Sequence, residues 1–120
     1  MASVAILTDS TADLTPDQAA SAGITVVPLY VRFGSDEYRA GVDLTTEQFW
    51  QKLLAAGAAF PTTAAPSPGD FTNAFNAAFE AGADAIVCPT IGQKLSATYQ
   101  SATLAAQAMP EREIHVIDTG

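Results

Sequence analysis

The sequence predicts an α/β fold, a three-layer sandwich built on a mainly parallel sheet with a small β-hairpin attached. Short apolar runs alternate with capped helical patterns along the chain, which is typical of βαβ units. Strands separated by helices require right-handed crossovers and parallel pairing, and we expect about four to five of them. The 120 residues suit one domain, residues 1–120, and 48% hydrophobic residues are enough to form its core.

The first predicted elements are an apolar strand over residues 4–8 and a short helix. Thr15 and Gln18 have the spacing of a capping box, and Pro16 suits the first position of a helix. Gly23 is expected to end this helix, because glycine readily adopts the left-handed conformation of a C-terminal cap.

A β-branched strand and a hairpin come next. The strand begins at residue 24 and is expected to continue past Pro28 to residue 33. Residues 34–36 have the composition of a turn, from which residues 37–39 return as a short antiparallel arm.

The second helix is expected to begin near Thr45 and to end at Gly57, before a proline-rich loop over residues 61–68. Four apolar residues at helical spacing are predicted to form its buried stripe: Phe49, Trp50, Leu53 and Leu54. Ser67 then caps a third helix, with Pro68 at its first position and Asp70 in its first turn. Three phenylalanines on one face of this helix are assigned to the core: Phe71, Phe75 and Phe79.

Two strands and one helix complete the prediction. Residues 85–88 form a strand, residues 96–108 form a helix closed by Pro110, and residues 114–117 form the last strand. His115 lies inside that strand, and we expect it to be a core histidine whose hydrogen bonds are satisfied.

Charge and cysteine content restrict the possible partners. Thirteen acidic residues against five basic ones give a net charge of −8, which disfavours nucleic acid and anionic membranes. The one cysteine cannot form an internal disulfide, and the N-terminus does not have the pattern of a signal peptide. Since no apolar run reaches membrane-spanning length, we expect a cytoplasmic protein without stable membrane insertion.

The carboxyl ends of parallel strands are where such sheets bind ligands, and three predicted loops meet there. These loops, residues 9–11, 62–63 and 89–96, all carry hydroxyl groups. Thr63 lies between two proline blocks, and Ser96 lies at a helix start whose free N–H groups can face an anion. The loops therefore suit a small anionic ligand held by neutral donors. Local pattern alone favours the plainer interpretation, in which Ser96 caps its helix and Thr63 shapes a turn.

A phosphate-handling hydrolase is the alternative from another functional class. Cys88 and Lys94 have the spacing of the phosphate loop of cysteine phosphatases, but that loop needs arginine at the second position. Asp9 has no adjacent acidic partner for magnesium, and Asp13 is expected near the start of the first helix. We find no metal-ligand spacing and no cofactor fingerprint, so we expect neither a metal nor a cofactor.

Six motifs lie in order along the chain: ILTDSTAD at 6–13, VPLYV at 27–31, GVDL at 41–44, PSPGDF at 66–71, LSATYQSA at 95–102 and VID at 116–118. Together they resemble the amino-terminal half of the DegV family of bacterial fatty-acid-binding proteins. The resemblance covers the whole chain. Members of this family are more than twice as long, so it implies a second domain that this chain does not contain.

The resemblance implies a lipid-binding protein and not an enzyme. Its ligand would be a long-chain fatty acid, presented to a separate fatty acid kinase, with Thr63 and Ser96 contacting the carboxylate. Five residues of the same loops are expected to line the remaining pocket: Ser10, Thr62, Thr90, Ile91 and Gly92. The chain departs from the family pattern at Ala64, Ala65 and Ala97, where the family usually has serine, glutamine and glycine. Gly92 and Gln93 stand where the family often has serines.

Overall fold

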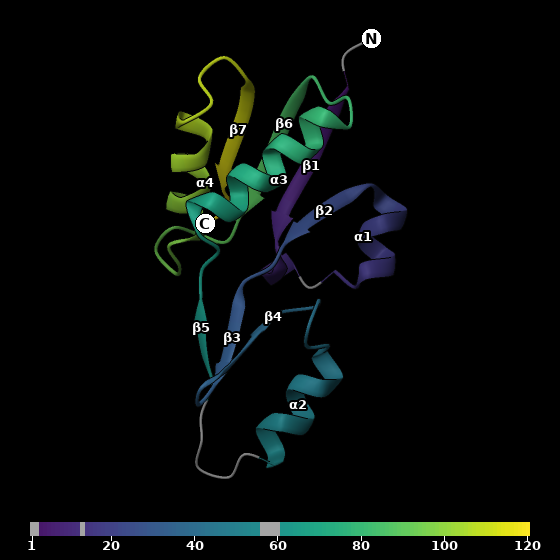
Figure 1. The fold of residues 1–120 in the computed structure, drawn as a ribbon, viewed down its shortest axis with the longest axis vertical. Helices are drawn as coiled ribbons and strands as arrows, with labels where there is room; N and C mark the ends of the chain where they lie inside the picture. Colours follow the sequence, from purple (N-terminus) through teal and green to yellow (C-terminus); the bar gives the residue numbers. More distant parts are fainter. Residues whose placement is uncertain (1–2, 13, 56–60) are drawn as a thin grey trace.

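The computed structural model describes residues 3–12, 14–55 and 61–120 and has two sheets (Figure 1). The larger sheet is parallel in the order β2-β1-β6-β7, with β1 (Val4–Asp9), β2 (Ile24–Val27), β6 (Ala85–Thr90) and β7 (Glu113–Asp118). The smaller sheet is antiparallel in the order β4-β3-β5, with β3 (Tyr30–Phe33), β4 (Asp36–Arg39) and β5 (Thr62–Ala64). The helices are the short 3-10 helix η1 (Ser10–Ala12), α1 (Pro16–Ala22), α2 (Thr46–Ala55), α3 (Pro68–Glu80) and α4 (Thr98–Gln107).

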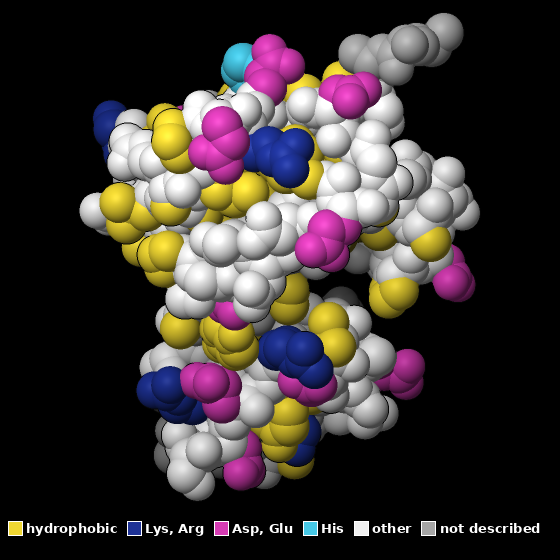
Figure 2. Space-filling model, turned by 45° about the horizontal axis from the view of Figure 1, so that its top comes forward, with side chains coloured by type: hydrophobic (Ala, Val, Ile, Leu, Met, Phe, Trp, Pro, Cys, Tyr) yellow, Lys and Arg dark blue, Asp and Glu magenta, His cyan; other side chains and the backbone are white. Residues whose placement is uncertain are grey.

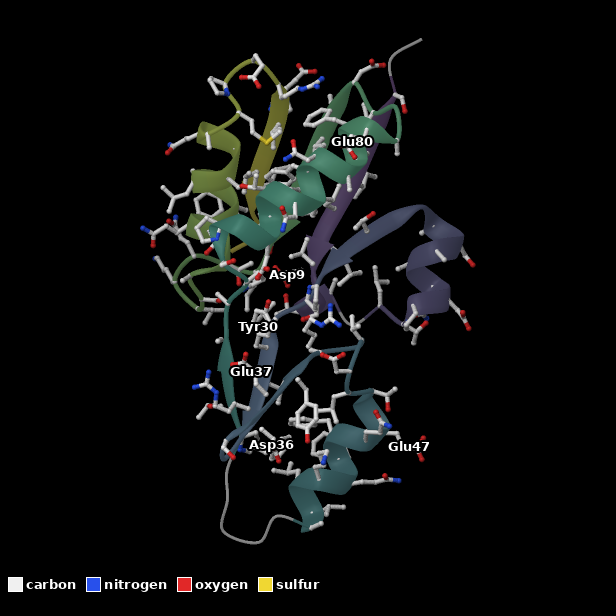
Figure 3. All side chains as sticks on the ribbon, in the orientation of Figure 1. Asp9, Tyr30, Asp36, Glu37, Glu47 and Glu80 are labelled. Atoms are coloured by element: carbon white, nitrogen blue, oxygen red, sulfur yellow. The ribbon has the colours of Figure 1, made fainter. Side chains whose placement is uncertain are left out.

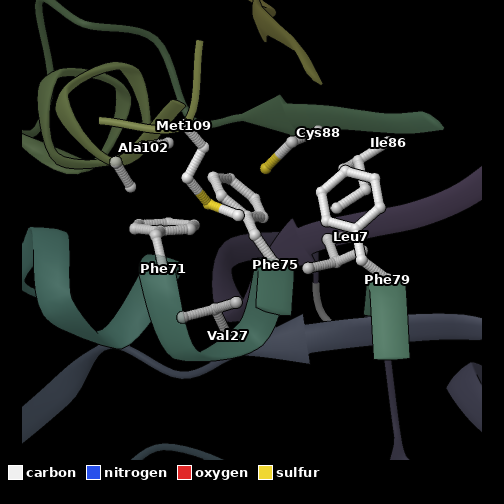
Figure 4. Packing of buried hydrophobic residues seen from close by; sticks show 10 residues of the cluster. Leu7, Val27, Phe71, Phe75, Phe79, Ile86, Cys88, Ala102 and Met109 are labelled. Carbon is white, nitrogen blue, oxygen red and sulfur yellow. The ribbon is translucent and has the colours of Figure 1, made fainter. Parts of the chain in front are cut away.

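Helix α3 supplies the centre of the core. Its predicted stripe is confirmed: Phe71 and Phe75 are fully buried and Phe79 is 8% exposed. These rings pack against the larger sheet and α4 (Figure 4), together with Leu7, Val27, Ile86, Cys88, Ala102, Ala105 and Met109. Burying one such large apolar side chain contributes roughly 1.5–3 kcal/mol, so this cluster is the main source of stability.

Both ends of the first helix and the start of the third are as predicted. The Thr15 hydroxyl accepts a hydrogen bond from the Gln18 backbone N–H (3.1 Å), and the Gln18 carboxamide oxygen accepts from the Thr15 N–H (3.0 Å). Gly23 closes α1 at φ 70°, the left-handed region that favours glycine. Ser67 and Asp70 form the same reciprocal pair at the start of α3.

Helices flank both faces of the larger sheet, with α3 and α4 on one face and α1 on the other. The layer formed by α1 covers its face only in part. Val27 lies in the core under α3, whereas Val26, which points to the other face of β2, borders a groove together with Ala19 of α1. Right-handed crossovers therefore place α1 on the face opposite α3 and α4. Away from α1 this second face carries exposed apolar side chains: Val4, Ile6 and Ile117.

Two predictions for the middle of the chain are wrong. The strand expected over residues 24–33 ends at Val27, and β3 belongs to the second sheet. Pro28 has no N–H to donate to a sheet ladder, so the chain leaves the parallel sheet there. The region expected to be a proline-rich loop contains β5, which pairs antiparallel with β3 and places Thr63 in a strand.

Three side chains that were predicted to be buried are exposed in the structure. Of the stripe predicted for α2, Phe49 and Leu53 are half-buried, but Trp50 is 55% and Leu54 83% exposed. Helix α2 therefore buries only a narrow face, on which the Phe49 ring lies 5.8 Å from that of Phe33. His115 is not a core residue: its side chain is 61% exposed and lies 3.6 Å from Glu113. The predicted end of α2, Gly57, lies outside the described residues, as does Asp13.

The second sheet and α2 together form a unit beside the sandwich, which we call the antiparallel unit (residues 30–55 and 62–64). It lies at one end of an elongated molecule of 52 × 28 × 24 Å (Figure 1). The radius of gyration is 15.1 Å, larger than the roughly 13.6 Å of a compact chain of this length. No described residue of the unit belongs to the core cluster of the sandwich.

Candidate functional site

The carboxyl edge of the larger sheet contains a topological switch point. The connection that leaves β1 leads to β2 on one side, and the connection that leaves β6 leads to β7 on the other, so the two connections diverge from the carboxyl ends of β1 and β6. Ligands of open α/β sheets bind in the crevice that such a divergence creates. Two of the three predicted loops begin at this point, directly after Asp9 and directly after Thr90.

Asp9 ties these two loops together across the switch point. Its side chain is fully buried, and its Oδ2 accepts a hydrogen bond from the Ile91 backbone N–H at 2.8 Å. Its Oδ1 accepts from the backbone N–H of Thr11 at 2.8 Å and from the Thr11 hydroxyl. Both carboxylate oxygens are thus occupied by donors of the protein itself, which makes Asp9 a structural group of the edge.

Ser96 precedes α4 by two residues, because the helix begins at Thr98 and not at residue 96 as expected. The helix-capping position is taken by Ala97, whose side chain cannot form a cap bond. The Ser96 Oγ accepts from the Thr98 backbone N–H at 3.2 Å and lies 2.8 Å from the Thr98 hydroxyl. When Thr98 is the donor of that pair, the Ser96 proton is free for a ligand at the helix start.

Thr63 lies in the antiparallel unit, exposed on β5 and directly opposite Val31 of β3. Residues opposite each other in an antiparallel pair share a face of the sheet, so Thr63 is on the face of Val31. Phe33, two residues further along β3, contacts α2 through Phe49, which makes this the α2 face. Thr62, also exposed, faces the other way, opposite Arg32.

The other predicted pocket residues are largely engaged in local structure. The Ser10 Oγ accepts from the Leu29 backbone N–H at 3.0 Å, and the Ile91 N–H donates to Asp9. Thr90 is buried, and its hydroxyl donates to the Ile91 carbonyl at 3.2 Å. Gly92 is buried against Gly120, so that a Cβ there would lie 2.7 Å from the Gly120 carbonyl carbon.

Two depressions lie beside these residues. An apolar groove of about 1040 Å³ runs between α1 and α2, with Ser10 at its wall together with Leu14, Val31, Leu44, Phe49 and Trp50. A shallower depression of about 570 Å³ follows α4 and includes Ser96, Tyr99 and Thr103. Ser96 belongs to the second depression, and Thr63 lines neither of the two.

A hydrogen bond that the sequence did not indicate joins the two parts of the molecule. The Tyr30 hydroxyl of β3 donates to Asp70 Oδ2 of α3 at 3.0 Å. This bond raises the pKa of Tyr30, because the ionised phenolate has no proton to donate to Asp70 and would lie against its carboxylate. Figure 3 labels Tyr30 at the end of the antiparallel unit that meets the sandwich. The capping pattern around Asp70 was visible in the sequence, but no local signal names a tyrosine forty residues away as its partner.

The arginines of the antiparallel unit are paired with carboxylates. Arg32 lies 2.6 Å from Glu37 in the hairpin, and Arg39 lies 3.0 Å from Asp43. Hydrogen bonds from Arg39 lower the pKa of Asp43, so this pair is ionised at neutral pH. Figure 2 shows basic side chains of this unit beside acidic ones. The charge of both arginines is therefore offset locally.

Cys88 is poorly placed for nucleophilic chemistry. It is fully buried among core residues of β6, and burial, with the nearby Asp9 charge, raises its pKa to about 12. A cysteine nucleophile needs the thiolate, which this environment suppresses.

Within residues 3–12, 14–55 and 61–120, no cluster of three or more His, Cys, Asp or Glu side chains could hold a metal ion. In the same part of the chain, no helix has the length and apolarity needed to cross a bilayer.

Comparison with known proteins places the whole chain in one family. The family model described as "uncharacterised protein, DegV family" matches residues 3–120. A DegV domain-containing protein of Deinococcus radiodurans is 45% identical over 117 residues, which are 98% of this chain and 41% of that protein. The chain therefore spans about two fifths of the length of this curated relative.

Solved structures have the same fold. A DegV family protein from Thermus thermophilus, described by its fatty acid binding, matches 98% of this chain and 41% of its own, with 42% identity and a TM-score of 0.84. The Streptococcus pneumoniae fatty acid kinase B3 protein, loaded with linoleic acid, matches 97% of this chain and 41% of its own, with 27% identity and a TM-score of 0.74. By sequence over nearly its full length and by fold, the chain belongs to the DegV family.

Proposed function

We propose that this protein binds a long-chain fatty acid at the carboxyl edge of its larger sheet and does not itself catalyse a reaction. The observation that carries the proposal is the match to the Thermus thermophilus fatty-acid-binding protein over 98% of the chain. The switch point between β1 and β6 supports it, because hydroxyl-bearing loops lie where a small ligand of such a sheet is expected.

Thr63 and Ser96 are the proposed contacts of the carboxylate. Ser96 offers a hydroxyl beside the first turn of α4, and the N-terminal end of a helix favours an anion. Thr63 offers a second hydroxyl from β5, on the face of that strand that α2 also faces. A hydrogen bond to a charged group contributes about 1.5–3 kcal/mol, so two neutral donors can hold a carboxylate without a lysine or arginine.

The bound acid is proposed to be handed to a separate fatty acid kinase, which would phosphorylate the carboxylate using ATP. The similarity to the Streptococcus pneumoniae fatty acid kinase B3 protein supports this partner. The binding protein would supply orientation and shelter from water, and no nucleophile or base. Since the kinase would consume ATP, the proposal places both proteins in the cytoplasm.

Enclosing the acyl tail requires more apolar surface than the described edge offers. Each buried methylene contributes about 0.8 kcal/mol, so tight binding needs walls on all sides of the tail. We propose that a second domain supplies the opposite wall, in keeping with the 41% of its relative that this chain spans.

Native mass spectrometry tests the ligand class. We expect full-length protein purified from bacterial cells to carry a mass that matches one long-chain fatty acid, released on denaturation and identified as such. Protein that carries no lipid, and that cannot be loaded with palmitate or oleate, would overturn the proposal.

Variants test the two contacts. Thr63→Val and Ser96→Ala in the full-length protein should each weaken palmitate binding by about 1 to 2 kcal/mol, because each removes one donor to the carboxylate. Calorimetry measures the affinity. Thr25→Val is the matched control, since Thr25 is an exposed threonine on β2, and its affinity should equal that of the unmodified protein. Unchanged affinity in both test variants would remove Thr63 and Ser96 from the site.

A further inference from the structure

We propose that Tyr30 and Asp70 are positioning residues for the carboxylate site. Their hydrogen bond holds β3, the strand with which the Thr63-bearing β5 pairs, against the sandwich that carries Ser96. The inference rests on the proposed function, and it adds a requirement that the two carboxylate contacts alone do not contain. The site is split between two units, so its geometry depends on how those units are joined.

The position of Thr63 follows from that of β3. In the smaller sheet β5 is an edge strand and pairs with β3 alone, with Thr63 opposite Val31 and Ala64 opposite Tyr30. Tyr30 is therefore next to Thr63 in the ladder, one residue along and one strand across. Any rotation of β3 relative to the sandwich carries Thr63 with it.

Asp70 is a fixed point for this strand. Its Oδ2, which accepts from Tyr30, also accepts from the Ser67 backbone N–H at 3.0 Å, and its own N–H donates to the Ser67 Oγ at 3.1 Å. The carboxylate is thus held in the capping box of α3. That helix is anchored in the core through Phe71 and Phe75, which are fully buried.

Among the side-chain hydrogen bonds of the described residues, the Tyr30–Asp70 bond is the one that directly joins the antiparallel unit to the sandwich. The antiparallel unit joins the sandwich through two short segments, Pro28-Leu29 and Ala65-Pro66. Ser10 fixes the first segment through the Leu29 N–H. The Tyr30–Asp70 bond acts beside the second segment, between β3 and the start of α3, and so restrains the swing of β5. Its donor–acceptor distance of 3.0 Å is that of a formed hydrogen bond.

The test compares a fatty acid with an alcohol of the same chain length. In the full-length protein, Tyr30→Phe should weaken palmitate binding about five- to twentyfold while hexadecanol binding changes less than about twofold, measured by displacement of a fluorescent acyl probe. The ratio of the two affinities reports the carboxylate contacts. A general loss of folded protein lowers both affinities together and leaves the ratio unchanged.

Matched variants separate positioning from packing. Tyr38→Phe is the control, because Tyr38 lies on β4 of the same sheet with its ring beside Lys52, and both affinities should stay unchanged. Asp70→Ala should lower the acid-to-alcohol ratio as Tyr30→Phe does. Asp70→Asn should restore most of it, because the carboxamide oxygen still accepts a hydrogen bond.

Each outcome decides between the two proposals. If the unmodified protein prefers palmitate and Tyr30→Phe and Asp70→Ala keep that preference, the positioning role is wrong while the proposed function stands. If the unmodified protein binds neither compound, the proposed function fails and this inference fails with it. If Tyr30→Phe does not fold, the Asp70→Ala and Asp70→Asn pair gives the same comparison, with equal ratios contradicting the inference.

Discussion

Asp9 and Cys88, two fully buried side chains on adjacent parallel strands, illustrate opposite ways of burying a titratable group. Asp9 receives hydrogen bonds from Thr11 and Ile91, which replace the water its carboxylate loses. Cys88 lies in the apolar core cluster, where burial keeps it a neutral thiol, and the nearby Asp9 carboxylate favours that form further. Asp9 organises the edge of the sheet, and Cys88 fills space.

The thiol of Cys88 should be inert in the folded protein. With its pKa raised to about 12, only about one part in ten thousand is thiolate at pH 8, and burial excludes the reagent as well. We expect no reaction with a disulfide reagent such as DTNB at pH 8 until the protein is unfolded. Because the chain has a single cysteine, unfolded protein provides the positive control of one thiol per chain. Rapid modification of folded protein would show that Cys88 is accessible and would reopen the hydrolase alternative.

At the scale of elements, α3 and α2 differ in how strongly they are fixed. Helix α3 has a capping box, a proline at its first position and a buried face of phenylalanines, so local and tertiary preferences agree. Helix α2 begins with a similar exchange of bonds between Thr45 and Gln48, but most of its apolar residues remain exposed. The antiparallel unit therefore depends on bonds such as Tyr30–Asp70 for its attachment.

Removing the cap of α3 should lower the stability of the sandwich. Ser67→Ala removes the acceptor of the Asp70 N–H and should reduce the free energy of unfolding by about 1 kcal/mol, measured by urea denaturation. Ser21→Ala, an exposed position inside α1, serves as the control and should change it by less than about 0.5 kcal/mol. A loss at Ser67 no larger than at Ser21 would mean that the cap does not stabilise the helix.

At the scale of the whole molecule, apolar surface remains uncovered on the side of the sheet away from α3. Val4, Ile6 and Ile117 are between 42% and 54% exposed there, and Trp50 and Val42 are exposed at the groove. Exposed apolar surface of this kind marks a place where another part of a protein packs. The curated relative, of which this chain spans 41%, has the additional length that our proposal assigns to a second domain.

The 120-residue chain by itself should therefore self-associate and bind palmitate or oleate at least about tenfold more weakly than a longer form. Sedimentation and calorimetry measure the two effects. Ile6→Thr combined with Ile117→Thr should reduce the self-association, since both lie on the uncovered face and threonine suits a strand. Submicromolar binding by a monomer of 120 residues would contradict the proposal that a second domain must enclose the acyl tail.

The sequence by itself determined the elements whose signals are local. The capping boxes at Thr15 and Ser67, the left-handed turn at Gly23 and the phenylalanine stripe of α3 depend on residues within a few positions of one another. The alternation of these elements was enough to predict a parallel sheet, and six ordered motifs identified the family. Local patterns of this kind reflect hydrogen bonds and burial within one helix or strand, so they can be recognised from the sequence alone.

Only the tertiary structure decided where residues distant in the sequence meet. Pairing with β3 made residues 62–64 a strand, and nothing within that segment predicts a partner thirty residues earlier. The exposure of His115 and Trp50 depends on which faces other elements cover, which periodicity does not reveal. The Tyr30–Asp70 bond spans forty positions for the same reason. Cross-element contacts are set by the geometry of the whole chain, and for that reason the proposed site spans two units that the sequence showed as one set of loops.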